Sequence, residues 1–227
     1  NDTWQAPFAK LRAEAPVHFQ PNSPTGPYWS VSSHELIKAV DTNHQVFSSA
    51  DGIAIAETPP QESLQSTDVV IENFIAMDSP DHDRQRATVA PSVAPSNLAN
   101  FEPMIRERVV DILSNLPAND TFDWVDEVSV ELTARMLATL FDFPFEDRSK
   151  LTYWSDVATG IPGMGVVDSE EHMQQEMLGC LEYFTELWNQ RVNAPEGNDL
   201  VSMLAHGEAT KNMGPMAYLG NLILLIV

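Results

Sequence analysis

The sequence predicts a mainly α-helical fold with a small β part. Apolar residues recur at three- and four-residue steps over several long segments, which is typical of amphipathic helices. Two short apolar runs, residues 17–19 and 28–31, flank a turn-rich segment and indicate one β-hairpin. The 227 residues, of which 43% are hydrophobic, can bury a sizeable core. We expect residues 1–227 to form one partial domain.

The first part of the chain is predicted to begin with a helix over residues 3–15 and the hairpin. Ser33 then caps a helix that continues to about Thr42. Residues 48–73 have no strong period, and so long a loop in a compact domain is usually functional or mobile. Pro80 suits the first position of the next helix, with Asp78 or Ser79 as its cap.

The remainder of the chain is predicted to be helical, with breaks at proline and glycine. A flexible segment, Gly160–Gly165, divides it. Ser169 and Asp199 are predicted helix caps. The predicted helices cover residues 96–116, 124–141, 146–158, 169–192, 200–204 and the segment from Pro215 onward. The predicted core-facing residues of two of them are Val125, Val128, Leu132, Met136 and Leu140, and Met173, Met177, Leu181, Phe184 and Trp188.

Charge and composition restrict the class of partner. The net charge of −21, from 33 acidic and 12 basic residues, repels nucleic acid and anionic lipid, so no nucleic-acid partner is expected. One cysteine allows no internal disulfide, which fits a cytoplasmic location, and the first twenty residues lack a signal-peptide pattern. Gly220 and Asn221 interrupt the final apolar run, which favours a core helix over a stable membrane anchor, although a tether remains an alternative.

Common cofactor and metal motifs are missing from the sequence, and no metal site is predicted. It has no glycine-rich dinucleotide motif, no phosphate-binding loop, and no Cys-x-x-Cys or His-Glu-x-x-His motif. The six histidines do not stand at metal-ligand spacing on one helix. Cys180 falls inside the helix 169–192, so we interpret it as a buried, inert thiol.

His82 and Arg86 form the candidate binding pair. Four residues apart on one helix, they share a face. An imidazole N–H and a guanidinium can bind carboxylates, and arginine can do so with two hydrogen bonds. The alternative is that Asp78 pairs with His82 and Asp83 with Arg86 on the surface. Each such pair would contribute only about 0.3–0.5 kcal/mol.

An ordered set of segments resembles the bacterial cytochrome P-450 enzymes, the haem-thiolate monooxygenases. Residues 77–86, Met-Asp-Ser-Pro-Asp-His-Asp-Arg-Gln-Arg, resemble the entry to that family's C helix. Its first hairpin and B helix, its short H helix and the start of its I helix are similar to residues 28–49, 198–204 and 217–227. Within the family, residues 74–78 and 219–227 are most similar to the soluble alkane ω-hydroxylases.

The resemblance implies the N-terminal half of the cytochrome P-450 fold, from the first hairpin and helix A to the start of helix I. It implies haem b (heme b) as cofactor, with His82 and Arg86 bonded to its propionates. Ser79 and Asp81 depart from the family's Pro and Glu but still favour a helix start. Loop 48–73 would cover the distal side of the haem, and residues 160–165 would link the F and G helices. The expected substrate-binding residues are Ile53, Ile55, Val166 and Val167.

By the same resemblance, the iron-ligand cysteine and the oxygen-activating residues lie beyond Val227, and the fragment is expected to be inactive alone. The intact enzyme would use O₂ and two electrons to hydroxylate an unactivated C–H bond. The expected substrate is apolar, with oxygen inserted at the terminal carbon of an n-alkane or fatty chain. A ferredoxin and a ferredoxin reductase would donate the electrons. The alternative is a non-catalytic helical ligand-binding or interaction domain without a cofactor.

Overall fold

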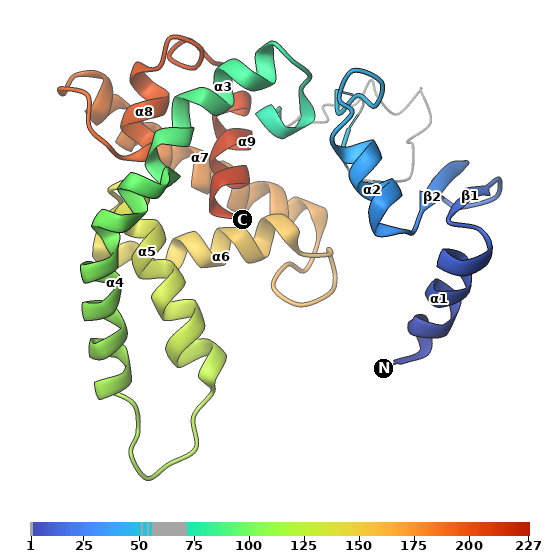
Figure 1. The fold of residues 1–227 in the computed structure, drawn as a ribbon. Helices are drawn as coiled ribbons and strands as arrows, with labels where there is room; N and C mark the ends of the chain where they lie inside the picture. The colour runs from blue at the N-terminus through green and yellow to red at the C-terminus, as the bar shows by residue number, and fades with distance from the viewer. Residues whose placement is uncertain (1, 51, 54, 56–71) are drawn as a thin grey trace. The chain divides into compact units, whose positions relative to one another are not determined.

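A computed structural model describes residues 2–50, 52, 53, 55 and 72–227. Most of the predicted loop 48–73 therefore lies outside the described residues. The chain divides into two compact units (Figure 1). The first contains the described residues up to 55 together with 75–80, and the second contains 72–74 and 81–227. That residues 1–227 form one partial domain stays a prediction.

The first unit contains the predicted hairpin between two helices. A short turn, η1 (Asp2–Trp4), leads into α1 (Gln5–Glu14). Strands β1 (Val17–Gln20) and β2 (Tyr28–Val31) pair antiparallel, with Val17 opposite Val31. The helix α2 (His34–Asp41) follows, and Ser33 caps it by accepting a hydrogen bond from the Leu36 N–H at 3.4 Å. The hairpin and the Ser33 cap are confirmed.

Asp78 holds the Ser48–Ser49 turn within this first unit. Its Oδ2 accepts a hydrogen bond from Ser48 Oγ at 2.5 Å, and its Oδ1 accepts one from the Ser49 N–H at 2.9 Å. Both bonds favour the carboxylate form and lower the pKa of Asp78. These bonds join residues that precede the long segment in the sequence to one that follows it.

The long elements of the second unit's described part are all helices, and the longest of them end close to where the sequence predicts. Its elements are η3 (Phe74–Ala76, which crosses from one unit to the other), α3 (Asp81–Val89), η4 (Ala90–Val93), α4 (Pro95–Ser114), the π-helix η5 (Val125–Val130), α5 (Glu131–Phe141), η6 (Phe145–Asp147), α6 (Ser149–Thr159), α7 (Glu170–Val192), α8 (Leu200–His206) and α9 (Pro215–Ile226). Ser169 caps α7 through the His172 N–H, and Asp199 caps α8 through the Ser202 N–H, as predicted. The mainly α fold with a small β part is confirmed.

The core of the second unit lies where α6, α7 and α9 meet, with α4 and α5 side by side as an antiparallel pair (Figure 1). Its largest fully buried side chains include Phe141, Leu151, Phe184, Leu204, Leu219 and Leu222. On α7 the buried residues are Met177, Cys180, Phe184 and Leu187, so Leu187 rather than Leu181 or Trp188 completes the buried face. Burial raises the pKa of the Cys180 thiol to about 12, as expected for an inert cysteine.

The predicted helix 124–141 is correct in extent but wrong in its buried face. The five predicted core positions all keep some exposure, and Val125 is 58% exposed. The buried residues of α5 are Ala134, Ala138 and Phe141. The segment begins as the π-helix η5, whose wider turn shifts the faces of the residues before α5 relative to those in it. This shift concerns only Val125 and Val128. Within α5 the period is regular, and the buried face was missed because Ala134 and Ala138 give little hydrophobic signal.

The last helix, α9, is a core helix. Tyr218, Leu219, Asn221 and Leu222 are all buried, which confirms the predicted burial of the final apolar run. Among the described residues, no helix combines the length and the apolar character that crossing a membrane requires.

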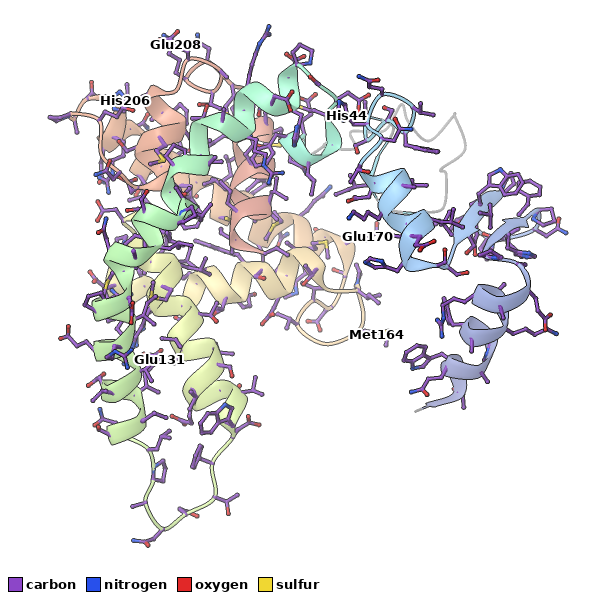
Figure 2. All side chains as sticks on the ribbon, viewed as in Figure 1. His44, Glu131, Met164, Glu170, His206 and Glu208 are labelled. Carbon is purple, nitrogen blue, oxygen red and sulfur yellow. The ribbon has the colours of Figure 1, made fainter. Side chains whose placement is uncertain are left out.

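The loop after α8 approaches α3 so closely that one position has no room for a side chain. A methyl group at Gly207 would overlap Thr88 Cγ2 on α3, Thr210 Oγ1 and the Met203 carbonyl oxygen. Thr210 is itself fully buried, and its hydroxyl donates to the Leu204 carbonyl at 2.7 Å. Figure 2 shows Glu208 and His206 at this end of α8.

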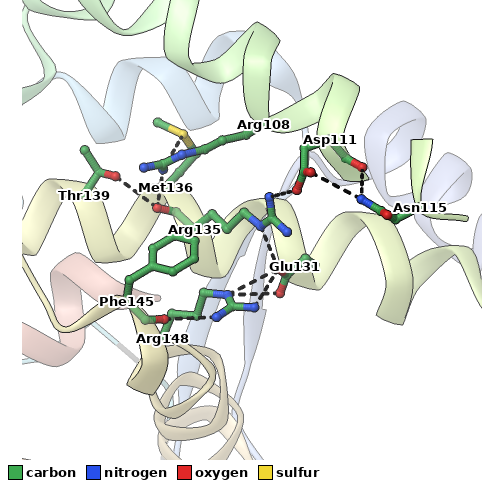
Figure 3. Close-up of polar contacts among 9 residues, drawn as sticks. All are labelled: Arg108, Asp111, Asn115, Glu131, Arg135, Met136, Thr139, Phe145 and Arg148. Carbon is green, nitrogen blue, oxygen red and sulfur yellow. Dashed lines mark hydrogen bonds and ion pairs between the residues drawn. The ribbon is translucent and has the colours of Figure 1, made fainter. Parts of the chain in front are cut away.

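A charged cluster centred on Glu131 joins α4, α5 and the start of α6 (Figure 3). Glu131 Oε1 accepts from Arg135 Nε at 2.6 Å and from Arg148 Nη2 at 2.8 Å. Arg135 also donates to Asp111 Oδ2 at 2.6 Å. Burial by itself would raise the pKa of Glu131, but the hydrogen bonds from Arg148 and Arg135 outweigh it and lower that pKa.

We expect Glu131→Gln to lower the free energy of unfolding by about 2 kcal/mol at pH 7, because two guanidinium groups lose their shared carboxylate. The folded-state pKa of Glu131 is lowered, so the carboxylate stabilises the fold above its ordinary pKa. That contribution disappears as the pH falls through the folded-state pKa. Urea unfolding of both proteins from pH 7 down to pH 3 measures the change.

The control for this prediction is Glu102→Gln, which removes an exposed pair with Arg106. It should cost less than about 0.5 kcal/mol at any pH. A difference between wild type and Glu131→Gln that stays constant down to pH 3 would contradict the electrostatic explanation.

Candidate site around His82 and Arg86

The helix α3 carries the candidate pair and begins with two acids. Asp81 and Asp83 stand in its first turn, where the helix dipole favours negative charge, and Arg86 stands in its last turn. His82 and Arg86 are four residues apart, so the helix presents them on one face, as predicted.

The imidazole of His82 is partly buried, with 27% of its side chain exposed. Its Nδ1 lies 2.8 Å from Asp83 Oδ1, whereas the surface-pair alternative expected Asp78 as the partner. The ring of Phe74 packs nearby, with 6.3 Å between ring centroids. Because a carboxylate only accepts hydrogen bonds, Asp83 orients the ring with Nδ1 toward itself and leaves Nε2 for another group.

Arg86 makes no hydrogen bond or ion pair with any residue that the structure describes. The expected surface pair between Asp83 and Arg86 is therefore wrong. Arg84, two positions earlier, differs because its guanidinium lies 3.5 Å from Asp81. In a chain with a net charge of −21, an arginine without such an acidic partner is a strong candidate for binding an external anion.

Arg86 lines a pocket of about 290 Å³ whose other walls are mainly apolar. Helices α3, α5, α8 and α9, the short helix η4 and the turn at Phe74 contribute to it. The other lining residues are Phe74, Val89, Ala90, Ser92, Val93, Leu140, Leu200, Leu224 and Leu225. Phe74 connects the two halves of the site because it lines the pocket with Arg86 and contacts the ring of His82.

Asn221 is a residue of this site that the sequence analysis treated only as an interruption of an apolar run. It is fully buried on α9. Its Oδ1 accepts a hydrogen bond from the Phe74 N–H at 2.9 Å, and its Nδ2 donates to Gln85 Oε1 at 2.9 Å. The signal that could have found it is the amide itself, because a polar side chain in a core helix must be paired.

This arrangement suits a flat apolar ligand with anionic groups at one edge. The leucine and valine side chains offer an apolar wall, and Arg86 and His82 offer hydrogen-bond donors beside it. The haem implied by the sequence resemblance has this character, with an apolar ring and two propionates. The residues present therefore fit the edge of a haem.

The four expected substrate-binding residues fall in different units. Ile53 and Ile55 belong to the first unit and are exposed, and the structure does not place them relative to the second. Val166 is exposed on the loop between α6 and α7, where Figure 2 shows Met164. Val167 is fully buried, and its carbonyl accepts a hydrogen bond from the Gly163 N–H at 2.9 Å.

Solved structures with the same fold match the whole chain. CYP153D17 from Sphingomonas sp. PAMC 26605 is 48% identical with a TM-score of 0.86, and the match covers 100% of this chain and 56% of that one. Cytochrome P450-153 from Novosphingobium aromaticivorans is 42% identical with a TM-score of 0.85, again over 100% and 56% of the two chains.

The curated relatives are also cytochrome P450 or monooxygenase proteins by name. Linalool 8-monooxygenase from Pseudomonas putida is 28% identical over 97% of this chain and 55% of its own length. Cytochrome P450(BM-1) from Priestia megaterium is 28% identical over 88% of this chain and 48% of its own length. No protein-family model matches the chain. The chain spans about half the length of the curated relatives it matches. In sequence and in fold alike, the chain is a homologue of the cytochrome P450 monooxygenases, which use haem.

Proposed function

We propose that the whole protein is a haem-dependent monooxygenase in which His82 and Arg86 bind the haem propionates. The observation that carries this proposal is the state of Arg86. Its guanidinium has no acidic partner among the described residues, and it lines an apolar pocket one helical turn from His82. A binding site for anions at the edge of an apolar ring needs this combination.

Each residue of the site has a separate task. Arg86 can bind a propionate with two parallel hydrogen bonds. His82 would donate from Nε2 while Asp83 accepts from Nδ1, so an imidazole that bridges both carboxylates carries a proton on each nitrogen. Phe74 and the leucines of α9 would contact the apolar ring beside these bonds.

When bound, haem b supplies the redox-active iron at which O₂ is activated with two electrons. The reaction proposed for the intact protein is insertion of one oxygen atom into an unactivated C–H bond. We do not assign Cys180 to the iron, because it is fully buried and lies on α7, away from the pocket-lining residues. The chain's own residues bind and orient the cofactor and line the apolar surface beside it.

The proposed substrate is an n-alkane or fatty chain, hydroxylated at its terminal carbon. The proposal is supported by the similarity of residues 74–78 and 219–227 to the alkane ω-hydroxylases. Relatives named for oxygenation of linalool and of steroid C26 also act on apolar molecules. Ile53, Ile55 and Val166 offer exposed apolar side chains for such a chain, and Val167 could contact it only after its loop moves.

The proposed electron donors are a ferredoxin and a ferredoxin reductase. Arg84 is the candidate docking residue, because it is 66% exposed on α3, the helix that also carries the proposed propionate ligands. The alternative, a non-catalytic helical domain without a cofactor, has no support from the comparisons.

We expect Arg86→Ala in the full-length protein to release haem at least about tenfold faster than wild type, since a charge-assisted bond to a propionate is lost. His82→Ala should have a smaller effect in the same direction. Haem transfer to excess apomyoglobin measures the rate. The matched control is Arg84→Ala on the same helix, which should leave the rate unchanged. Equal rates for Arg86→Ala and wild type would contradict the proposed role.

The substrate proposal predicts that the full-length holoenzyme, supplied with a ferredoxin, its reductase and NADH, converts n-octane mainly to 1-octanol. An apolar channel that holds the chain lengthwise presents its end, rather than its more reactive interior carbons, to the oxidant. Gas chromatography of the alcohols gives the ratio. Products dominated by 2- and 3-octanol would overturn the assignment to terminal hydroxylation while leaving the monooxygenase proposal intact.

The docking proposal predicts that Arg84→Glu slows reduction of the ferric holoenzyme by an acidic ferredoxin about threefold to tenfold at low salt, because like charges oppose encounter. Its absorption spectrum should stay unchanged. Stopped-flow reduction measures the rate. The control is Arg12→Glu on α1, which makes the same charge change elsewhere. A slowing of equal size in both variants would indicate a general charge effect and not a docking site.

A further inference from the structure

Asn221 is a buried polar residue of the second unit that joins segments far apart in the sequence. Its hydrogen bonds connect residues separated by 147 and 136 positions along the chain. It is fully buried, so neither end of its amide can be satisfied by solvent. An amide in this position is favourable only while both of its bonds are made.

The direction of the amide follows from its partners. The Phe74 N–H can only donate a hydrogen bond, so the atom that faces it must be the acceptor Oδ1. This leaves Nδ2 to donate to Gln85 Oε1, with Met213 Sδ at 3.8 Å on the same side. Only a side chain with an acceptor and a donor on one short branch satisfies both segments at once. Leucine and aspartate each lose at least one of these bonds.

The two partners of Asn221 flank the proposed haem-binding residues. Gln85 directly precedes Arg86 on α3, and Phe74 lines the pocket with Arg86 and contacts the His82 ring. On α9, Leu224 and Leu225 follow Asn221 at three and four residues, so they lie on the same side of the helix and line the same pocket. The amide of Asn221 therefore fixes α3 and α9, which form two walls of the pocket, relative to each other.

We propose that Asn221 is a positioning residue of the haem site. By bonding to Phe74 and Gln85 together, it holds Arg86 and the apolar wall of α9 in the arrangement that the haem edge requires. A rotation of α3 that broke the bond to Gln85 would turn Arg86 with it, because the two residues are adjacent on one helix. This inference rests on the proposed function of His82 and Arg86.

The test uses Asn221→Leu in the full-length holoenzyme, a change close to isosteric that removes both hydrogen bonds. We expect haem release to apomyoglobin to become about tenfold faster. Ser202→Ala is the matched control, because Ser202 is also fully buried and loses a comparable bond, from the Gly197 N–H at 2.6 Å, outside the pocket lining. It should leave haem release unchanged even where urea unfolding shows reduced stability. Equal acceleration in both variants would overturn the proposal.

A double variant separates positioning from general destabilisation. Because Asn221 is proposed to hold Arg86 together with the α9 wall, Arg86→Ala with Asn221→Leu should accelerate haem release by clearly less than the product of the two single-variant factors. Rate factors that multiply would show that the two residues act independently and would overturn the inference. Should Asn221→Leu fail to fold, Gln85→Met removes one of the two bonds from a partly exposed position, and the same cycle with Arg86→Ala applies.

The proposed function and this inference fail in different ways. If Arg86→Ala does not change haem release, the role of Arg86 is wrong, and the inference falls with it. If Arg86→Ala accelerates release but neither Asn221→Leu nor Gln85→Met does, Arg86 keeps its role and only the positioning role of Asn221 is rejected.

Discussion

The hydrogen bonds of Asn221 are the constraint on which the rest of the site depends. They join the chain before α3, the middle of α3 and the centre of α9, three segments that no local sequence pattern brings together. Apolar packing alone allows helices to rotate and slide by small amounts, whereas a paired buried amide permits one register. The apolar walls of the pocket supply most of the contact, and the amide determines which residues face it.

Electrostatics explains why Arg86 is distinct among the arginines of the second unit. Arg135 and Arg148 share Glu131, and Arg191 bonds to Asp142. Those guanidinium groups hold the helices together and are compensated by carboxylates. Arg108 also lacks an acidic partner among the described residues, but its guanidinium donates to the Arg135 carbonyl on α5. Arg86 has neither kind of partner among the described residues, and it lines a pocket. The chain has 33 acidic residues, so the lack of an acidic partner for Arg86 among the described residues needs an explanation.

The sequence predicted hydrogen bonds between residues close together in the chain, but it did not predict contacts between distant segments. The caps at Ser33, Ser169 and Asp199 depend on residues three positions away, so the sequence pattern identifies them. The buried face of α5 was mispredicted because two of its three buried residues are alanines, which give little hydrophobic signal. His82 and Arg86 were proposed from spacing and family resemblance, and their role stays a prediction, whereas Asp83 as the partner of His82 was not anticipated. The role of Asn221 depends on residues more than 130 positions away and needed the three-dimensional structure.

The close approach of the α8 loop to α3 has a consequence for how the protein can change over evolution. At Gly207 a single methyl group has no space, so a library randomised at this position should return glycine almost without exception. Exposed neighbours such as Glu208 and Ala209 carry no such restriction and should accept most residue types. The contact between the α8 loop and α3 therefore tolerates change at its exposed positions but not at Gly207, where the two segments approach most closely.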